Sequence, residues 1–197
     1  MKILVAYASR HGATMGIAER IAERLRARDV EVTLTTAAAA PRPDAFDAVV
    51  IGAAAYMGHW MTEATRYVRR YGDALAARPV WLFSSGPIGT ETVDAKGRDV
   101  LAASRPVESD EVSRTTNARE LRVFYGAFDP DTPRVGLVER LGAPFLRMPA
   151  IRGAMPTGDF RDWAAIDAWA DGIADALVPR EDRVAEPVVP GGGAAVA

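Results

Sequence analysis

Cysteine is absent from the 197 residues, and histidine occurs only twice, at His11 and His59. Without thiols the chain forms no disulfide, iron–sulfur cluster, zinc–thiolate site or thiolate nucleophile. Two imidazoles far apart in the sequence are too few for a His-rich metal site. Any redox chemistry of this chain therefore depends on a bound organic cofactor or on another protein.

Excess charge and long apolar runs are also missing. The formal net charge is only -2, which provides no global basic field, so we expect no nucleic-acid partner. No run reaches the ~20 apolar residues that span a bilayer, and the first apolar run is too short for a signal peptide. We therefore expect a cytoplasmic protein.

Three common catalytic and nucleotide-binding motifs do not occur in the sequence. The pattern GxxxxGK[ST] is absent, which argues against an ATP or GTP P-loop, and GxGxxG is absent, which argues against a nicotinamide-type fingerprint. The nucleophile elbow GxSxG of serine hydrolases is absent as well. Ser, His and Asp side chains are present, but their pattern indicates no acid–base triad.

Apolar runs alternate with helical patterns along most of the chain. Continuous apolar runs at 3–8, 48–53 and 80–85 predict buried parallel strands, and two further strands are expected at 30–34 and 121–128. Amphipathic helices are expected after Thr14 and at 61–77, 109–118, 135–146 and 162–177. Asp159 is a candidate cap for the last of them.

This alternation predicts an α/β fold with three layers, in which helices cover a five-stranded parallel sheet with right-handed crossovers. A ligand loop after the first strand favours the strand order 2-1-3-4-5. Two prolines in 37–44 leave little room for a helix between the second and third strands. We expect one domain over residues 1–178 and a disordered, Pro/Gly/Ala-rich tail over 179–197.

Ligands in open α/β sheets bind at the carboxyl ends of the strands, beside the switch in strand order. Three loops are expected to meet there. In the first, Gly12 permits close backbone approach, and the following helix offers free amides to a phosphate. The alternative is a simple strand-to-helix connection. The residues of this predicted phosphate loop are Ser9, Arg10, His11, Gly12, Ala13 and Thr14.

The second and third loops offer surfaces for a flat, mostly apolar ring such as isoalloxazine. Tyr56 is the stacking candidate, whereas Trp60 alternatively belongs to the core face of the next helix, and His59 is expected to be structural. The second loop supplies Ala53, Ala54, Ala55, Tyr56, Met57 and Gly58. The third supplies Ser84, Ser85, Gly86, Pro87 and Gly89, or is merely a turn at the exit of a strand.

The first loop resembles the Ser/Thr-x-x-Gly-x-Thr pattern of the flavodoxin family. Residues 50–53 followed by Tyr56-x-Gly58-His59, the motif at 125–128 and the pair Asp162-Trp163 resemble one branch, menaquinone-dependent protoporphyrinogen oxidase and its relatives. This resemblance spans roughly residues 1–178. It implies a flavodoxin-like fold and FMN as cofactor, with its phosphate on the first loop and its ring between the other two.

The resemblance also implies a function. We expect an FMN-dependent oxidoreductase that passes electrons from a reduced organic donor, by resemblance protoporphyrinogen IX, to a quinone-like acceptor. The alternatives are an electron carrier that docks to protein redox partners, and a non-catalytic flavin-binding protein. Residues 91–117 are acidic where the oxidase carries a basic, apolar insertion, and 140–152 form a basic and apolar segment. The sequence leaves open whether the protein contacts the inner face of a membrane peripherally and whether it forms a homodimer.

Overall fold

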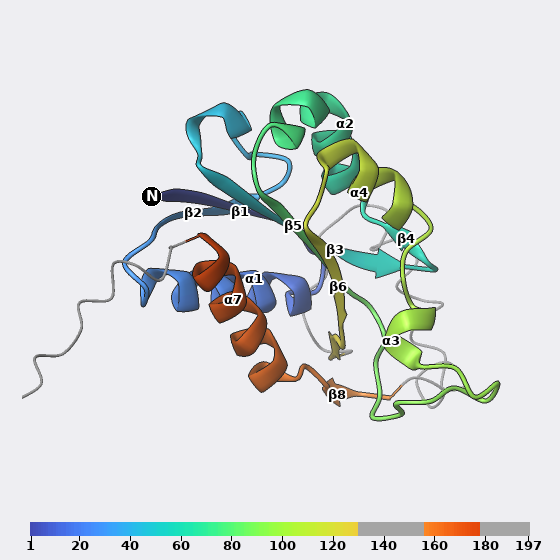
Figure 1. Cartoon of the computed structure of the whole chain (residues 1–197). Coiled ribbons are helices and arrows are strands. Elements are labelled where there is room, and N and C mark those ends of the chain that lie inside the picture. The colour runs from blue at the N-terminus through green and yellow to red at the C-terminus, as the bar shows by residue number, and fades with distance from the viewer. Residues whose placement is uncertain (130–155, 178–197) are drawn as a thin grey trace, which may run out of the picture.

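The first apolar run forms an inner strand of a parallel sheet (Figure 1). Strand β1 (Lys2–Ala8) pairs in parallel with β2 (Glu31–Thr36) on one side and with β3 (Ala48–Tyr56) on the other. Strands β5 (Val80–Ser85) and β6 (Glu120–Phe124) extend the sheet, so that its order is β2-β1-β3-β5-β6. Counted over the parallel strands alone this order is 2-1-3-4-5, as predicted.

The structure is a computed structural model that describes residues 1–129 and 156–177. Its helices are α1 (Ala13–Arg26), α2 (Thr62–Ala76), α3 (Val100–Ala103), α4 (Ser109–Thr116) and α7 (Trp163–Leu177), with a 3-10 helix η1 (Pro43–Ala45). The short strands are β4 (His59–Trp60), β7 (Ala127–Phe128) and β8 (Gly158–Asp159). The predicted helix at 135–146, the segment 140–152 and the predicted disordered tail at 179–197 lie outside the described residues.

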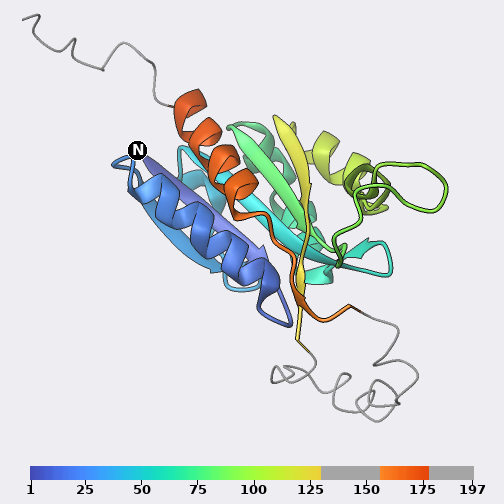
Figure 2. The ribbon, with the colours of Figure 1, turned by 90° about the horizontal axis from the view of Figure 1, so that it is seen from below.

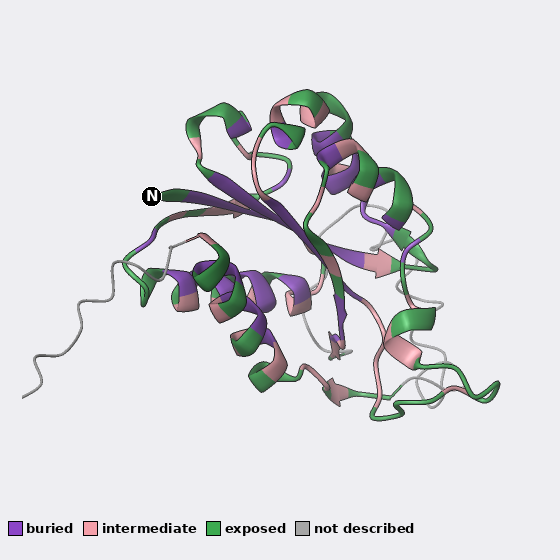
Figure 3. Cartoon of the chain, viewed as in Figure 1, coloured by how far each residue is buried: buried purple, intermediate pink, exposed green. Residues whose placement is uncertain are grey.

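Helices cover both faces of the sheet. Helices α1 and α7 lie side by side on one face, and α2 and α4 lie on the other (Figures 1 and 2). Alternate residues of each strand point to opposite faces, so Ile3 and Val5 pack with α1 and α7 whereas Leu4 and Ala6 pack towards α2. Burial accordingly concentrates in the strands and on the inner sides of the helices (Figure 3).

The predicted apolar stripe of α1 is confirmed, because Ile17, Ile21 and Leu25 are fully buried. Its polar side is not simply solvated. Three arginines spaced one turn apart each form an ion pair with an aspartate of α7, and these pairs fasten the two helices along their length. The pairs are Arg20–Asp167 at 2.6 Å, Arg24–Asp171 at 2.5 Å, and Arg28–Asp175.

The predicted strand at 121–128 is wrong as a single element. Strand β6 ends at Phe124, and β7 pairs instead with β8 in a separate antiparallel ribbon. The reason lies in Gly126, whose amide donates to the carbonyl of Pro87 at 2.8 Å and whose carbonyl accepts from the amide of Phe160 at 3.1 Å. Its backbone groups form hydrogen bonds with neighbouring loops instead of continuing the parallel pairing of β6 with β5.

Two details at the start of α7 also differ from the prediction. Asp162 caps the helix, since its carboxylate accepts the amide of Ala165 at 2.9 Å, whereas Asp159 lies in β8 and accepts from Arg161. Trp163 is 37% exposed and is not part of the core face. The second and third parallel strands are joined through η1 alone, as the prolines predicted. Within the described residues, no helix is long and apolar enough to cross a membrane.

Candidate functional site

Helix α1 begins without a side-chain cap. Gly12 occupies the N-cap position with φ 83° and ψ −19°, and the first turn contains no acidic residue. The first hydrogen bond of the helix runs from the amide of Gly16 to the carbonyl of Gly12 at 2.9 Å. The amides of Ala13, Thr14 and Met15 therefore have no acceptor within the helix. Together with the helix dipole, they favour an anion at this end.

The space beside this helix start is open. A Cβ atom added to Gly12 would meet no heavy atom within 4 Å, so side chains of the described residues do not plug the turn. The positive φ is the reason for glycine, because a left-handed conformation strains most other residues. Among the described residues, the turn thus has both amides without a backbone acceptor and open space at Gly12, which a phosphate group requires.

The three predicted loops converge, as the topology requires. Between the first and third segments, the hydroxyls of Thr14 and Ser85 form a buried hydrogen bond of 2.7 Å. Between the first and second, the ring of His11 meets the ring of Tyr56 edge-on at 6.1 Å, and the guanidinium of Arg10 lies 5.7 Å from the same Tyr56 ring. Segments far apart in the sequence thus form one edge of the sheet.

The second segment is a hairpin rather than a loop. Strand β3 continues through Ala53, Ala54 and Ala55 to Tyr56, and β4 turns back antiparallel to it, with Tyr56 opposite His59. The two residues between them, Met57 and Gly58, both have positive φ, 51° and 80°, which is the geometry of a type I′ turn. The sequence analysis missed this hairpin, although an x-Gly turn after an apolar run is its usual signal.

The hairpin exposes its tip and buries its far strand. Met57 is 99% exposed and Tyr56 is 39% exposed, whereas Trp60 is 4% exposed and packs in the core on the α2 side. Tyr56 therefore remains the aromatic ring available at the edge. The predicted alternative for Trp60 is right about its burial in the core, but Trp60 belongs to β4 and not to the next helix.

A second polar contact anchors the hairpin from outside the predicted site. The carboxylate of Glu108, at the start of α4, contacts Nδ1 of His59 at 2.8 Å and accepts the amide of Trp60 at 3.1 Å. The amide of Val107 donates to the carbonyl of Gly58 at 2.9 Å. Burial raises the pKa of Glu108, but these hydrogen bonds outweigh it and the net pKa lies below the usual value. Almost fifty residues separate the partners, so sequence pattern gave no sign of this contact.

The third segment is partly inside the sheet. Ser84 and Ser85 belong to strand β5 and are buried, so their hydroxyls are not at the rim where the sequence analysis placed them. The Ser84 hydroxyl has no hydrogen-bond partner among the described residues. Of the predicted residues, Gly86, Pro87 and Gly89 lie in the loop itself. Its backbone is held by Gly126, a residue to which the sequence analysis gave no role at the site.

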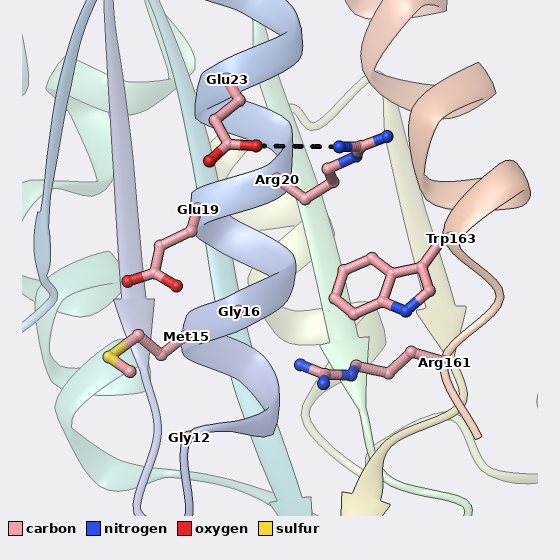
Figure 4. A pocket seen from close by; sticks show the side chains of 8 residues that line it. All are labelled: Gly12, Met15, Gly16, Glu19, Arg20, Glu23, Arg161 and Trp163. Carbon is pink, nitrogen blue, oxygen red and sulfur yellow. Dashed lines mark ion pairs between the residues drawn. The ribbon is translucent and has the colours of Figure 1, made fainter. Parts of the chain in front are cut away.

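An open groove of about 600 Å³ lies beside the phosphate loop, between the first three turns of α1 and the start of α7 (Figure 4). It shares only Gly12 with the predicted site residues and lies on the outer side of α1. Its other lining residues are Met15, Gly16, Glu19, Arg20, Glu23, Arg161 and Trp163.

Comparison with known proteins agrees with this geometry. The sequence model of a family described as flavodoxin domain matches residues 4–147. No curated protein matches the chain. A flavodoxin from the domain Archaea is similar over 90% of this chain and 99% of its own, with a TM-score of 0.55 and 15% identity.

Two other solved structures have the same likeness at low identity. A flavodoxin from Pseudomonas aeruginosa covers 90% of this chain and 99% of its own, with a TM-score of 0.53 and 15% identity. Rubredoxin oxygen:oxidoreductase from Desulfovibrio gigas matches 89% of this chain with 36% of its own, with a TM-score of 0.50 and 14% identity. Likeness at these identities shows a shared fold.

Proposed function

The chain belongs to the flavodoxin-domain family, and from this premise we propose that it binds FMN at the carboxyl edge of the sheet and passes electrons through it. The single observation that carries the proposal is the start of α1. Its amides are uncapped, Gly12 leaves open space beside them, and two further segments converge on the same edge. These features fit a phosphate ester and a ring attached to it.

Different residues of this edge would bind the phosphate and the ring of FMN. The amides of Ala13, Thr14 and Met15 would hold the phosphate, with Ser9 as a further donor, while the buried hydroxyl of Thr14 would fix the loop through its hydrogen bond to Ser85. The hairpin and the loop at 86–89 would flank the ring and exclude water from it. When bound, FMN supplies the hydride and one-electron chemistry that the side chains lack.

Within this proposal, the role of electron carrier is better supported than that of a substrate-specific enzyme. Family membership and a flavodoxin fold both agree with a carrier that docks to a protein redox partner. The exposed tip formed by Tyr56 and Met57 would stand beside the ring, where a partner makes contact. A cytoplasmic place of action is part of the same proposal.

A second candidate is an oxidoreductase that takes electrons from a small molecule and gives them to a quinone. Protoporphyrinogen is the substrate that the resemblance names. Two observations favour keeping this candidate: the motif at 125–128 contacts the third segment through Gly126, and Asp162 of the Asp162-Trp163 pair caps α7. Both motifs thus have structural roles in the fold, although neither identifies a substrate.

A spectroscopic experiment separates these functions. The purified full chain, after incubation with FMN and removal of the excess, is expected to show flavin absorption. Bleaching only in the presence of a reductase protein would identify a carrier. Bleaching by a quinol or by protoporphyrinogen, with reoxidation by a quinone, would identify the oxidoreductase. A colourless protein that does not retain FMN would contradict the proposal as a whole.

A further inference from the structure

Arg161 comes from the segment just before α7 but lies against the first turn of α1 (Figure 4). One of its terminal nitrogens, Nη1, donates to the carbonyl of Ala13 at 3.3 Å. The same nitrogen would be only 2.4 Å from a Cβ atom on Gly16. Glycine at position 16 is therefore what allows the guanidinium to reach the helix start.

The guanidinium is fixed in this position from two further sides. Asp159 accepts from Nε at 2.7 Å and from Nη2 at 2.6 Å, and the Trp163 ring lies 4.3 Å from the guanidinium carbon. The Arg161 side chain is only 16% exposed. The paired guanidinium also lowers the pKa of Asp159 through the side-chain hydrogen bond. Because Arg161 is already oriented, little conformational entropy remains to be lost when a ligand binds.

The positive charge of Arg161 lies near the end of α1 that is already positive because of the helix dipole. Cations stabilise the carboxyl end of a helix, where this helix carries Arg24 and Arg26, and anions stabilise the amino end. Here a cation packs on the amino end, which has neither an acidic residue nor a cap. Asp159 offsets that repulsion in the free protein. An anion bound at the start of the helix would give the guanidinium a second favourable partner.

We propose that Arg161 is a specificity residue that makes the site prefer phosphorylated over unphosphorylated flavin. It acts by its charge and by its contact with the backbone of the phosphate loop. The inference rests on the proposed function, since it assigns the anion at α1 to the phosphate of FMN. The inference adds Arg161 to the binding site. This residue lies far along the chain from the three loops at the switch point of the sheet.

The test compares two ligands that differ only in phosphate. Dissociation constants of FMN and riboflavin are measured by quenching of flavin fluorescence in the wild type and in Arg161→Gln. We expect FMN affinity to fall roughly three- to tenfold, the range of a charge near a helix terminus, with riboflavin affinity unchanged. Arg161→Lys, which keeps the charge, is expected to retain most of the preference for FMN.

Arg69→Gln is the matched control. Arg69 also forms a bidentate pair with a carboxylate, that of Glu111, at 2.8 and 3.1 Å, but on the opposite face of the sheet. It is expected to change neither dissociation constant. Equal losses for FMN and riboflavin in Arg161→Gln would show a purely structural role and overturn the inference. Unchanged dissociation constants for both flavins would overturn it as well, while leaving FMN binding intact.

Inorganic phosphate separates this inference from the flavin proposal. Phosphate is expected to raise the melting temperature of the wild type more than that of Arg161→Gln. If the wild type binds no flavin but shows this difference, the flavin proposal fails and the anion-binding role of Arg161 stands. If phosphate stabilises both proteins equally and the FMN-to-riboflavin ratio is the same in both, the role of Arg161 is wrong.

Discussion

Helices α1 and α7 lie side by side on the same face of the sheet, yet they begin in opposite ways. Asp162 caps α7 with a hydrogen bond to the amide of Ala165. At the start of α1 there is only Gly12, with no side-chain cap and no acid in the first turn. A capped start has its amides satisfied by the protein itself, whereas an uncapped start leaves them for a ligand. The contrast supports the proposal that α1 is the binding helix and that α7 is its structural neighbour.

Apart from their starts, α1 and α7 are held in the fold by the same kinds of contact. Both present an apolar stripe to the sheet, and the ion pairs between them run along their shared side. The difference at their starts is therefore local and does not reflect a difference in packing. Substitutions at each start are expected to separate ligand affinity from stability.

The largest effect is expected from Gly12→Asp, which places a carboxylate where the phosphate would bind. Like charges at close range lower FMN affinity by at least about 3 kcal/mol, a loss of more than a hundredfold. Equilibrium binding followed by fluorescence measures it. Gly12→Asn, which has the same shape without the charge, is expected to lose less.

Gly97→Asp is the matched control for this substitution. Gly97 also has a positive φ, 74°, and open space around its Cβ position, but it lies in an exposed turn outside the site. It carries the same backbone strain, so a loss of FMN affinity there would show that strain, and not charge at α1, explains the result.

Thr14→Ala comes next. We expect it to weaken FMN by about 1–3 kcal/mol, because the phosphate loop loses the buried hydrogen bond to Ser85 that holds it against the third segment. Thr116→Ala removes an equally buried threonine hydroxyl, which donates to the carbonyl of Val112 at 2.8 Å within α4. Binding titrations that show the same loss in both variants would argue against a direct role for Thr14.

Much of this contrast could be predicted from sequence. The apolar runs identified three of the five parallel strands, and the Ile17, Ile21 and Leu25 stripe identified α1, because burial imposes a pattern on residues close in sequence. Gly12 followed by Thr14 predicted a phosphate loop, and the structure places the uncapped start of α1 at these residues. The order of strands then predicted which loops meet.

What sequence did not show depends on contacts between distant residues. Arg161 reaches Ala13, and Glu108 reaches His59, across separations for which no local pattern exists. The end of β6 was missed because Tyr125 and Phe128 favour a strand by propensity, while Gly126 makes hydrogen bonds to neighbouring loops. The last helix was predicted to begin at Asp162 with Asp159 as its cap, whereas the helix begins at Trp163 and the hydrogen bond from Ala165 makes Asp162 the cap.

Asp162→Ala tests the capped start of α7. Loss of the cap is expected to lower the free energy of unfolding by about 1 kcal/mol, because the first amides of α7 lose their acceptor. Chemical denaturation measures this loss. FMN affinity is expected to be unchanged, and a parallel fall in affinity would show that α7, too, belongs to the binding surface.

The smallest effect concerns the ion pairs that join the two helices. The hydrogen bond from Arg20 lowers the pKa of Asp167. A carboxyl whose folded pKa is depressed stabilises the fold above its unfolded pKa, about 3.9, and this stabilisation is lost as the pH falls through the folded pKa. Urea unfolding should therefore show a gap between the wild type and Asp167→Asn at neutral pH that closes in acid. A gap independent of pH would assign the effect to packing.

The amides at the start of α1 provide the most direct measurement. In a ¹⁵N-labelled sample, FMN is expected to shift the resonances of Ala13, Thr14 and Met15 strongly, because these amides gain a charged acceptor. Riboflavin, which lacks the phosphate, is expected to leave them nearly in place while it shifts residues of the hairpin. Equal shifts of the three amides with both ligands, or none with FMN, would contradict the account.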